Sequence, residues 1–398
     1  MFTKSKILRE IEIFFLSSPL VVTLMSIFNF TDTKFILSRL IPIVCIYSLI
    51  KYRRDFKKNI NSKLNVFFLL GTLWIIIFCF YHIFRGDEFS IARTLITSLV
   101  YLICIPWRLI SKTYIFYLIS ISSIICGLNA FYESFILDIP RVGIATNPIP
   151  YALYVSFLLL SCLYFIFNSK LKTLRIMSCL GGLLTLSAII MTEVRGIIIF
   201  IPISILYLCF SFFKISIRNI FVLSVFSFII TLFFYFAFQK DINSRIEQTK
   251  VEFSLIKKDN LSSSIGIRLA LWNHGLDVIN QAPIFGVGDI ALQESISHLA
   301  NPGAAQQPHL HNQYLDFLAR YGILGSIVII TFFLSLIIKI KDSGIEYSGH
   351  PLINSMLIML ILAGLTDVPL YHTHIIYLLI IFLGILRVNL HQDTDEIS

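Results

Sequence analysis

The chain has 398 residues, of which 57% are hydrophobic and only 14% are charged, and its mean hydropathy is +0.83. This composition supplies too little polar surface for a water-soluble globular protein, which indicates that lipid is the main solvent. The formal net charge is +9, but Lys and Arg occur in short clusters between apolar runs, a pattern typical of membrane orientation signals rather than of nucleic-acid binding.

Apolar runs long enough to cross a membrane recur along the sequence, since a helical crossing needs about 20 apolar residues. They predict about twelve transmembrane helices, at residues 11–29, 35–50, 64–84, 91–110, 114–137, 149–167, 174–192, 196–213, 219–238, 320–340, 351–368 and 371–388. The first run follows a basic start and lacks a small-residue cleavage pattern, so we expect a retained helix rather than a signal peptide. The sequence therefore predicts an all-α, polytopic membrane protein.

The Lys and Arg residues are distributed unevenly between alternate loops, and this bias sets the orientation of a membrane protein. With the N-terminus in the cytoplasm, most of them lie in cytoplasmic segments, above all between residues 51 and 63. The short outer loops then contain only Lys34, Arg85, Arg141 and Arg195. We therefore expect a multi-pass protein of the bacterial inner membrane, with both termini in the cytoplasm and one long loop in the periplasm.

That long polar loop divides the chain into three parts. We expect transmembrane helices in residues 1–238, the periplasmic loop in residues 239–313, and further transmembrane helices with a cytoplasmic tail in residues 314–398. Within the loop we predict a mixed-charge helix at 241–258 and a second helix near 265–280, with N-cap candidates among Ser262 to Ser264. None of the seven cysteines lies in this loop, which argues against a disulfide framework or a cysteine-based metal site.

Ionisable residues are nearly absent from the centres of the predicted spans, whereas transporters and proton relays usually place some there. The charged residues collect at the outer ends instead, which favours a site at the outer membrane face. The densest cluster there is His309-Leu310-His311-Asn312. If one helix carries His311 and Gly322, both lie on one face, and the glycine lets a neighbouring helix approach closely. An imidazole there can take a proton from a hydroxyl, so His311 is a candidate general base; alternatively, it caps the helix start.

Two arginines are candidates for binding phosphate, because the guanidinium group is always charged and suits phosphate geometry. Arg268 follows the predicted N-terminus of the second loop helix, where an anion also meets free backbone N–H groups. Arg195 lies between two spans with almost no connecting loop, so we expect it at the outer interface. The alternatives are a solvated Arg268 and, for Arg195, a snorkelling side chain or a pair with Glu193. Arg141, six residues before Asn147, is a candidate of the same kind.

At these positions the sequence resembles the O-antigen ligases of lipopolysaccharide synthesis, a superfamily shared with O-antigen polymerases and bacterial protein O-oligosaccharyltransferases. The family pattern of His, then Asn, Ser or Gln, then nine residues and a Gly-x-x-Gly is matched by His311, Asn312, Gly322 and Gly325. The family's loop arginine matches Arg268, and its arginine at a span end matches Arg195, although Val194 stands where many members have Ser or Thr. The segment Gly364 to Asp367 is similar to a late Gly-Leu-Ser/Thr-Asp segment of the family.

The resemblance implies transfer of O-antigen glycan from undecaprenyl diphosphate to a hydroxyl of the lipid A-core, without nucleotide, metal or other cofactor. It implies inversion at the anomeric carbon, with His311 as base and with Arg268 and Arg195 stabilising the diphosphate. The expected substrate-binding residues are Arg141, Asn147, His309, Asn312 and Asp367. His372 and His374 lack a clear third ligand, so no metal site is expected there. The expected partners are the two lipid-linked glycans and membrane lipid, and not nucleic acid.

Two alternatives stay open at the level of sequence. The first is the O-antigen polymerase of the same superfamily, which uses the same class of donor but a second lipid-linked glycan as acceptor. The second is a flippase for polyisoprenoid-linked glycans. The nearly charge-free span centres argue against a flippase, since moving a diphosphate across the membrane favours cationic groups at mid-depth.

Overall fold

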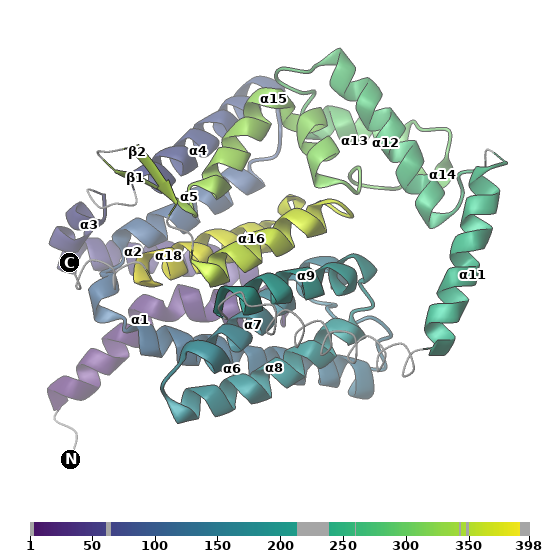
Figure 1. Ribbon diagram of the computed structural model, residues 1–398. Coiled ribbons are helices and arrows are strands. Elements are labelled where there is room, and N and C mark those ends of the chain that lie inside the picture. The colour runs from purple at the N-terminus through teal and green to yellow at the C-terminus, as the bar shows by residue number, and fades with distance from the viewer. Residues whose placement is uncertain are drawn as a thin grey trace.

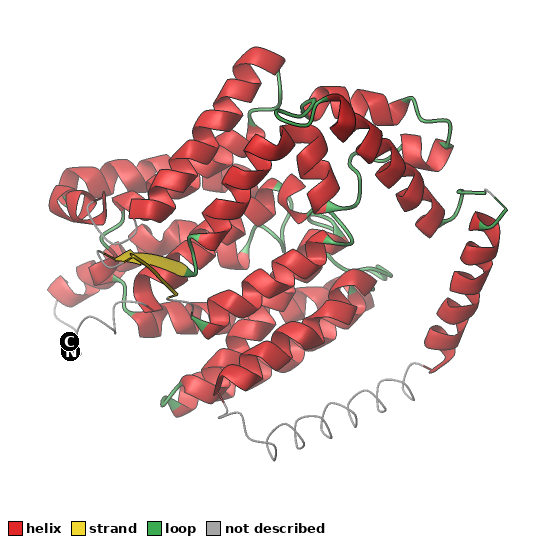
Figure 2. Cartoon of the chain, turned by 45° about the horizontal axis from the view of Figure 1, so that its top comes forward, coloured by secondary structure: helices red, strands yellow, loops and turns green. Residues whose placement is uncertain are grey.

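The computed structural model describes residues 4–60, 65–212, 239–258, 260–341, 344–347 and 350–390. The described residues are almost entirely helical, as Figure 2 shows. The predicted span at 219–238 lies outside them. A two-stranded antiparallel hairpin is the exception to the helical structure, with β1 (Ile338–Lys341) paired to β2 (Gly344–Tyr347).

Seven helical segments of the described part are long and apolar enough to cross a membrane. They are α2 (Thr33–Lys51), α4 (Asn65–Arg85), α6 (Lys112–Phe131) with the π-helical turn η2 (Tyr132–Ile136), α7 (Pro148–Asn168), α8 (Lys172–Met191), α9 (Arg195–Phe212) and α15 (Gln313–Leu334). Three shorter apolar segments join them, namely α5 (Ser90–Cys104), α16 (Pro351–Gly364), and α17 (Thr373–Tyr377) followed by the π-helix η4 (Leu378–Leu383) and α18 (Gly384–Leu390). The 22-residue α1 (Lys4–Met25) precedes them all. The predicted all-α, polytopic class is thus confirmed.

Some predicted boundaries are wrong around α15 and α16. The span expected at 320–340 begins seven residues earlier, at Gln313, because Asn312 caps the helix there, and it ends at Leu334. The sequence Ile-Lys-Ile-Lys that follows alternates apolar and charged residues, a period that favours the strand β1. The span expected at 351–368 ends at Gly364, and the next residues form a turn that includes the 3-10 helix η3 (Pro369–Tyr371).

The core of the bundle lies where α6, α7, α8 and α9 gather with α16 (Figure 1). Small residues permit the closest approach, since a side chain at Gly127 would collide with Leu184 and one at Gly181 would press on Ser123. Large rings fill the centre of the bundle, and Phe28 stacks on the fully buried Tyr154 of α7 at a ring distance of 4.4 Å. Two short elements, the polar α3 (Arg53–Ile60) and the 3-10 helix η1 (Trp107–Leu109), connect the longer helices.

The predicted extramembrane loop forms its own helical layer at one end of the bundle (Figure 1). It contains α11 (Gln239–Ile256), α12 (Ser264–Gln281), α13 (Asp289–Ser297) and the single-turn α14 (Pro302–Ala305). Both predicted loop helices are therefore confirmed, and the hydroxyl of Ser263 caps α12 by accepting from the backbone N–H of Gly266 at 3.1 Å. Buried apolar side chains from α12, α13 and the chain before α15 form a separate small core, which includes Leu271, Leu292 and Leu310.

Candidate active site

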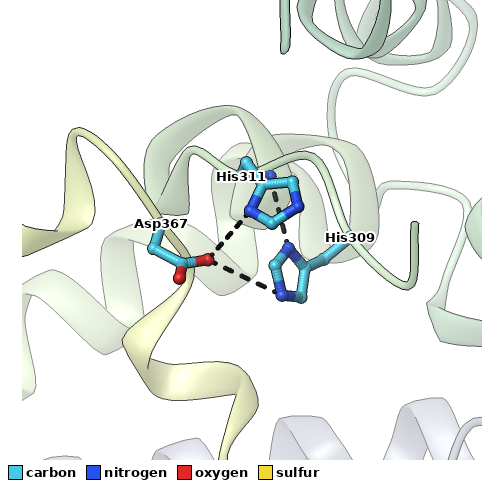
Figure 3. Close-up of side chains that lie close together, drawn as sticks. All are labelled: His309, His311 and Asp367. Atoms are coloured by element: carbon cyan, nitrogen blue, oxygen red, sulfur yellow. Dashed lines mark hydrogen bonds and ion pairs between the residues drawn. The ribbon is translucent and has the colours of Figure 1, made fainter. Parts of the chain in front are cut away.

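Two histidines and an aspartate meet at the end of the bundle that carries the extramembrane layer (Figure 3). His309 and His311 lie on the segment between α14 and α15, and Asp367 lies in the turn after α16. The Oδ1 atom of Asp367 lies 3.2 Å from Nδ1 of His311 and 3.6 Å from Nε2 of His309. All three side chains are largely buried, and His311, at 18%, is the most exposed. A carboxylate thus faces both imidazoles from a turn more than fifty residues away in sequence.

His311 does not lie on the helix with Gly322, so the expectation of one continuous helix is wrong. α15 begins at Gln313, because the side chain of Asn312 caps it by accepting from the backbone N–H groups of Tyr314 and Leu315. His311 precedes this cap and has a φ of 50°, a left-handed conformation that a residue with a side chain adopts rarely. The turn aims the imidazole at Asp367 rather than along the helix.

α15 itself is interrupted at Gly322, where φ is 64°. The interruption admits the loop between α12 and α13, since the carbonyl of Pro283 accepts from the N–H of Ile323 at 2.9 Å. The N–H of Val287 in turn donates to the carbonyl of Ala319 at 2.8 Å. A side chain at Gly322 would collide with the backbone of this loop. Gly322 thus fixes the extramembrane layer to the bundle just below the histidines.

Arg320 holds the histidine segment in place from the same helix. Only 2% of its side chain is exposed, and its Nη2 donates to the carbonyl of Pro308 at 2.9 Å. Its Nε donates at 2.6 Å to Asp316, whose other oxygen accepts from the backbone N–H of Leu310 at 3.0 Å. A third contact joins Nη1 to Asp289, the first residue of α13, at 3.0 Å. The backbone on both sides of His309 is therefore fixed by one buried, fully paired guanidinium group.

The hydrogen bonds of the two histidines indicate which ring nitrogens carry protons. Nδ1 of His309 accepts from the backbone N–H of His311 at 3.3 Å, which leaves the proton of a neutral ring on Nε2, facing Asp367. Burial lowers the pKa of His309 to about 3, so this ring is uncharged at neutral pH. Burial alone would raise the pKa of the Asp367 carboxyl, but the His311 hydrogen bond and the two nearby imidazoles hold it below its ordinary value. Asp367 therefore faces the histidines as a carboxylate.

His311 has an oxygen acceptor at each ring nitrogen. Nδ1 faces the Asp367 carboxylate, and Nε2 lies 2.9 Å from Oε1 of Gln307. The amide nitrogen of Gln307 donates to the carbonyl of Gly303, which fixes its oxygen toward the imidazole. A neutral imidazole carries one proton, so His311 can donate to Asp367 or to Gln307 but not to both at once. With that proton on Nδ1 facing Asp367, Nε2 is the acceptor, and the Gln307 oxygen occupies the position from which a substrate hydroxyl would deliver a proton to it.

The same three side chains are the ones in the described part of the chain that could hold a metal ion. One ligand atom each from His309, His311 and Asp367 lies within 4.8 Å of the others. Two imidazoles and a carboxylate suit zinc or ferrous iron. However, Nδ1 of His311 is hydrogen-bonded to Asp367 and Nε2 of His309 faces the same carboxylate at 3.6 Å, so a metal ion would have to displace both contacts. The arrangement therefore fits a proton-transfer pair with fewer changes than a metal site.

The two predicted phosphate ligands lie on elements that border this cluster. Arg195 begins α9, and the next residue, Gly196, packs so closely on Thr366 that a side chain there would collide. Arg268 lies in the second turn of α12, one turn before Trp272. The indole of Trp272 donates to the carbonyl between the two histidines, that of Leu310, at 3.0 Å. Neither arginine makes a hydrogen bond or ion pair with another residue of the described segments.

The other predicted substrate-binding residues have structural hydrogen bonds. Nε of Arg141 donates to the carbonyl of Thr192, three residues before Arg195, at 3.2 Å. Asn147 caps α7 with its side chain, as Asn312 caps α15. These contacts order the helix ends near the cluster, and a role in binding substrate stays a prediction for all three residues.

Two openings flank the cluster. The first is an apolar groove of about 400 Å³ between α15 and α16, which extends from Gln313 and Gly364 beside the cluster toward Ile337. Nε2 of Gln313 is buried at the end of the groove beside the cluster and has no hydrogen-bond partner among the described residues. The second is a more polar cavity of about 370 Å³ on the other side of η3. Leu370 lines the groove and Tyr371, its neighbour, lines the cavity.

Sequence reasoning missed Gln307 and Arg320. Gln307 had a usable signal, since it lies four residues before His311 in the same polar stretch. Arg320 stood at the expected start of a span, where an arginine is ordinarily a snorkelling side chain. Its role depends on contacts with α13 and with Pro308, which no local pattern reveals.

Comparisons with known proteins bear on this geometry. Residues 180–330 match the protein family described as O-antigen ligase, a range that includes Arg195, Arg268 and the histidine segment. An uncharacterized protein of Haemophilus influenzae is 30% identical over 92 residues, which cover 21% of this chain and 22% of that relative. The chain thus matches less than a quarter of the length of this relative.

Proposed function

Since the match over residues 180–330 supports the O-antigen ligase and polymerase superfamily for this chain, we propose that the protein is an O-antigen ligase. It transfers a glycan from undecaprenyl diphosphate to a hydroxyl of the lipid A-core. The observation that carries this proposal is the pairing of His311 with Asp367, with the Gln307 oxygen at the second ring nitrogen. This is the geometry that a base needs to deprotonate an incoming hydroxyl.

The reaction is a single displacement. As the acceptor hydroxyl replaces Gln307 beside His311, its proton passes to Nε2 and its oxygen attacks the anomeric carbon. The bond from that carbon to the diphosphate oxygen breaks, and undecaprenyl diphosphate leaves with the electron pair, so the configuration inverts. Asp367 stabilises the imidazolium that forms. His309 does not compete for the proton, because burial lowers its pKa to about 3 and its Nδ1 already accepts from a backbone N–H group.

The leaving group gains negative charge as the bond breaks, and two arginines are available to stabilise it. Arg195 and Arg268 lie on α9 and α12, which border the cluster from different sides, and the described residues leave their guanidinium groups unpaired. An arginine matches diphosphate oxygens with two parallel hydrogen bonds. The free amide N–H group of Gln313 adds a donor where the apolar groove reaches the cluster.

The apolar groove between α15 and α16 suits the polyprenyl tail of the donor. Its lining is almost entirely aliphatic and aromatic, including Phe317, Ile329 and Leu360, and its polar end meets the cluster. A tail in this groove places the diphosphate next to Gln313 and the anomeric carbon near His311. The groove thus connects the membrane with the reacting atoms.

We propose a bacterial inner-membrane location with the site in the periplasm and both termini in the cytoplasm. α3, which carries the basic cluster of residues 53–58, lies at the end of the bundle opposite α12, α13 and α14 (Figure 1). The basic end is expected inside, because positive charges favour cytoplasmic loops. The extramembrane layer and the histidine cluster then face the periplasm.

A deletion strain tests the proposed function. Gel profiles of its lipopolysaccharide should show bare core, with lipid-linked polymer accumulating in the membrane. Core that carries a single repeat would instead identify the polymerase of the superfamily, and an unchanged profile would refute both. Complementation with His311→Ala should fail while His309→Asn, which keeps an acceptor for the backbone N–H group, restores part of the product.

A further inference from the structure

The polar cavity beside η3 lies next to the candidate active site. It lies between the outer ends of α2, α5 and α7 and the start of α13, and its volume is about 370 Å³. Tyr371 and His372 form the wall that it shares with the histidine cluster. Their rings lie 5.2 Å and 6.5 Å from the ring of His309. A ligand in the cavity is therefore separated from His309, which packs against the proposed base His311 at a ring distance of 4.4 Å, by a single layer of side chains.

The lining offers the groups that recognise sugar hydroxyls. Glu88 and Asp289 provide carboxylate acceptors, Gln293 provides both a donor and an acceptor, and Thr146 provides a hydroxyl. Tyr371 adds an aromatic surface against which the apolar face of a sugar ring can pack. A sugar presents alternating donors and acceptors on a ring with one apolar face, and this lining matches both properties.

The charges of the cavity argue against a phosphate as its ligand. Its arginine, Arg320, already binds Asp316, Asp289 and a backbone carbonyl, so its charge is neutralised. The carboxylates of Glu88 and Asp289 would repel an anion, and they oppose the single lysine of the lining, Lys34. A neutral, hydroxyl-rich ligand avoids this repulsion and uses the carboxylates as acceptors.

The position of the cavity indicates which substrate the sugar belongs to. The groove assigned to the donor's tail and the cavity lie on opposite sides of the turn at Leu370 and Tyr371. In an inverting displacement the acceptor oxygen and the leaving oxygen lie on opposite sides of the anomeric carbon. A donor held on the groove side therefore leaves the cavity side for the acceptor.

We propose that this cavity binds a terminal sugar of the acceptor glycan and so holds the acceptor beside the histidine cluster. The proposal rests on the proposed transferase function and adds the position and chemistry of the acceptor site. Glu88 is a specificity residue in it, since its carboxylate lies in the lining and among the described residues is bonded only to the hydroxyl of Ser90.

Full-length protein in detergent micelles tests the proposal with two soluble probes, delipidated core oligosaccharide and a single repeat-unit oligosaccharide. Ligand-observed NMR should detect binding of one probe, and the probe that binds identifies the acceptor as core or as glycan repeat. Glu88→Gln and Thr146→Val should each weaken this binding and raise the acceptor KM by about tenfold or more, while the donor KM stays unchanged. Glu294→Gln, an exposed change on α13 away from the cavity, is the matched control.

The outcomes separate this proposal from the transferase function. A raised donor KM with unchanged acceptor binding would assign the cavity to the donor and overturn the proposal, as would wild-type values in both variants. If the wild-type protein binds a probe but transfers no glycan, and the variants lose that binding, the sugar site is supported and the proposed reaction is refuted.

Discussion

Replacing Asp367 by asparagine tests the proton-transfer pair with a change of almost no volume. The carboxylate lies 3.2 Å from Nδ1 of His311, and it also accepts from the backbone N–H of Val368 at 2.8 Å. An asparagine oxygen can keep the backbone hydrogen bond, so the turn after α16 should fold. What is lost is the negative charge beside the imidazolium that forms when His311 takes the acceptor's proton.

The expected magnitude follows from that single charge-assisted hydrogen bond. Hydrogen bonds to charged groups contribute about 1.5–3 kcal/mol, and each 1.36 kcal/mol on the barrier is a factor of about ten in rate. Because the imidazolium forms during the reaction, the loss should appear in kcat rather than in the donor KM. Asp367→Asn should therefore lower kcat by about ten- to a hundredfold.

The assay is transfer from lipid-diphosphate donor to lipid A-core by purified protein, with both substrates varied. Asp277→Asn, an exposed carboxylate on α12 outside the cluster, is the matched control and should keep wild-type rates. A wild-type kcat for Asp367→Asn would refute the role of the carboxylate. A raised donor KM with unchanged kcat would place Asp367 in donor binding instead.

Four further predictions concern the phosphate ligands, acid stability, metal and topology. Arg195→Ala and Arg268→Ala should each abolish or severely reduce transfer in a protein that still accumulates, and Lys at either position should restore it only in part. Wild-type decoration of lipid A-core by both Ala variants would exclude contact between these arginines and the diphosphate. The pKa of His309 is lowered from 6.5 to about 3 in the folded protein, so the unfolded chain binds more protons. The contribution of neutral His309 to the stability of the folded protein is therefore complete above pH 6.5 and is lost as the pH falls toward 3. In detergent, the melting temperature of His309→Asn should fall less with acid than that of the wild type. Purified protein should remain active in EDTA, and activity that disappears and returns with a divalent ion would turn the His309, His311 and Asp367 cluster into a metal site. In a cysteine-free background, an impermeant thiol reagent should label a cysteine at position 260 and not one at position 56, and the reverse pattern would invert the topology.

The sequence was sufficient to predict the class of fold and the local signals within it. Runs of apolar residues mark the long helices, and the serines before α12 predicted its cap, because both depend on near neighbours in sequence. The prediction of one helix through His311 and Gly322 is wrong, and the periodicity of the sequence could not reveal the cause. The backbone of residues 283–287 donates and accepts across the interruption at Gly322, and such pairing depends on the tertiary fold.

The candidate site was predictable in its residues but not in its geometry. His311 and Asp367 were both identified by motif, yet their direct contact joins positions 56 residues apart. The supporting role of Arg320 requires three partners from separate segments, and the position of Gln307 at Nε2 depends on the left-handed turn at His311. Spacing along the chain carries no information about these contacts.

The proposed transfer reaction can be reconstituted from purified components. Purified full-length protein in lipid vesicles receives undecaprenyl-diphosphate-linked glycan and lipid A-core, without nucleotide, and the product is analysed by mass and by anomeric configuration. We expect glycan joined to core with inverted configuration, release of undecaprenyl diphosphate, and loss of both products in His311→Ala. Retained configuration, or equal product from the wild type and His311→Ala, would contradict it.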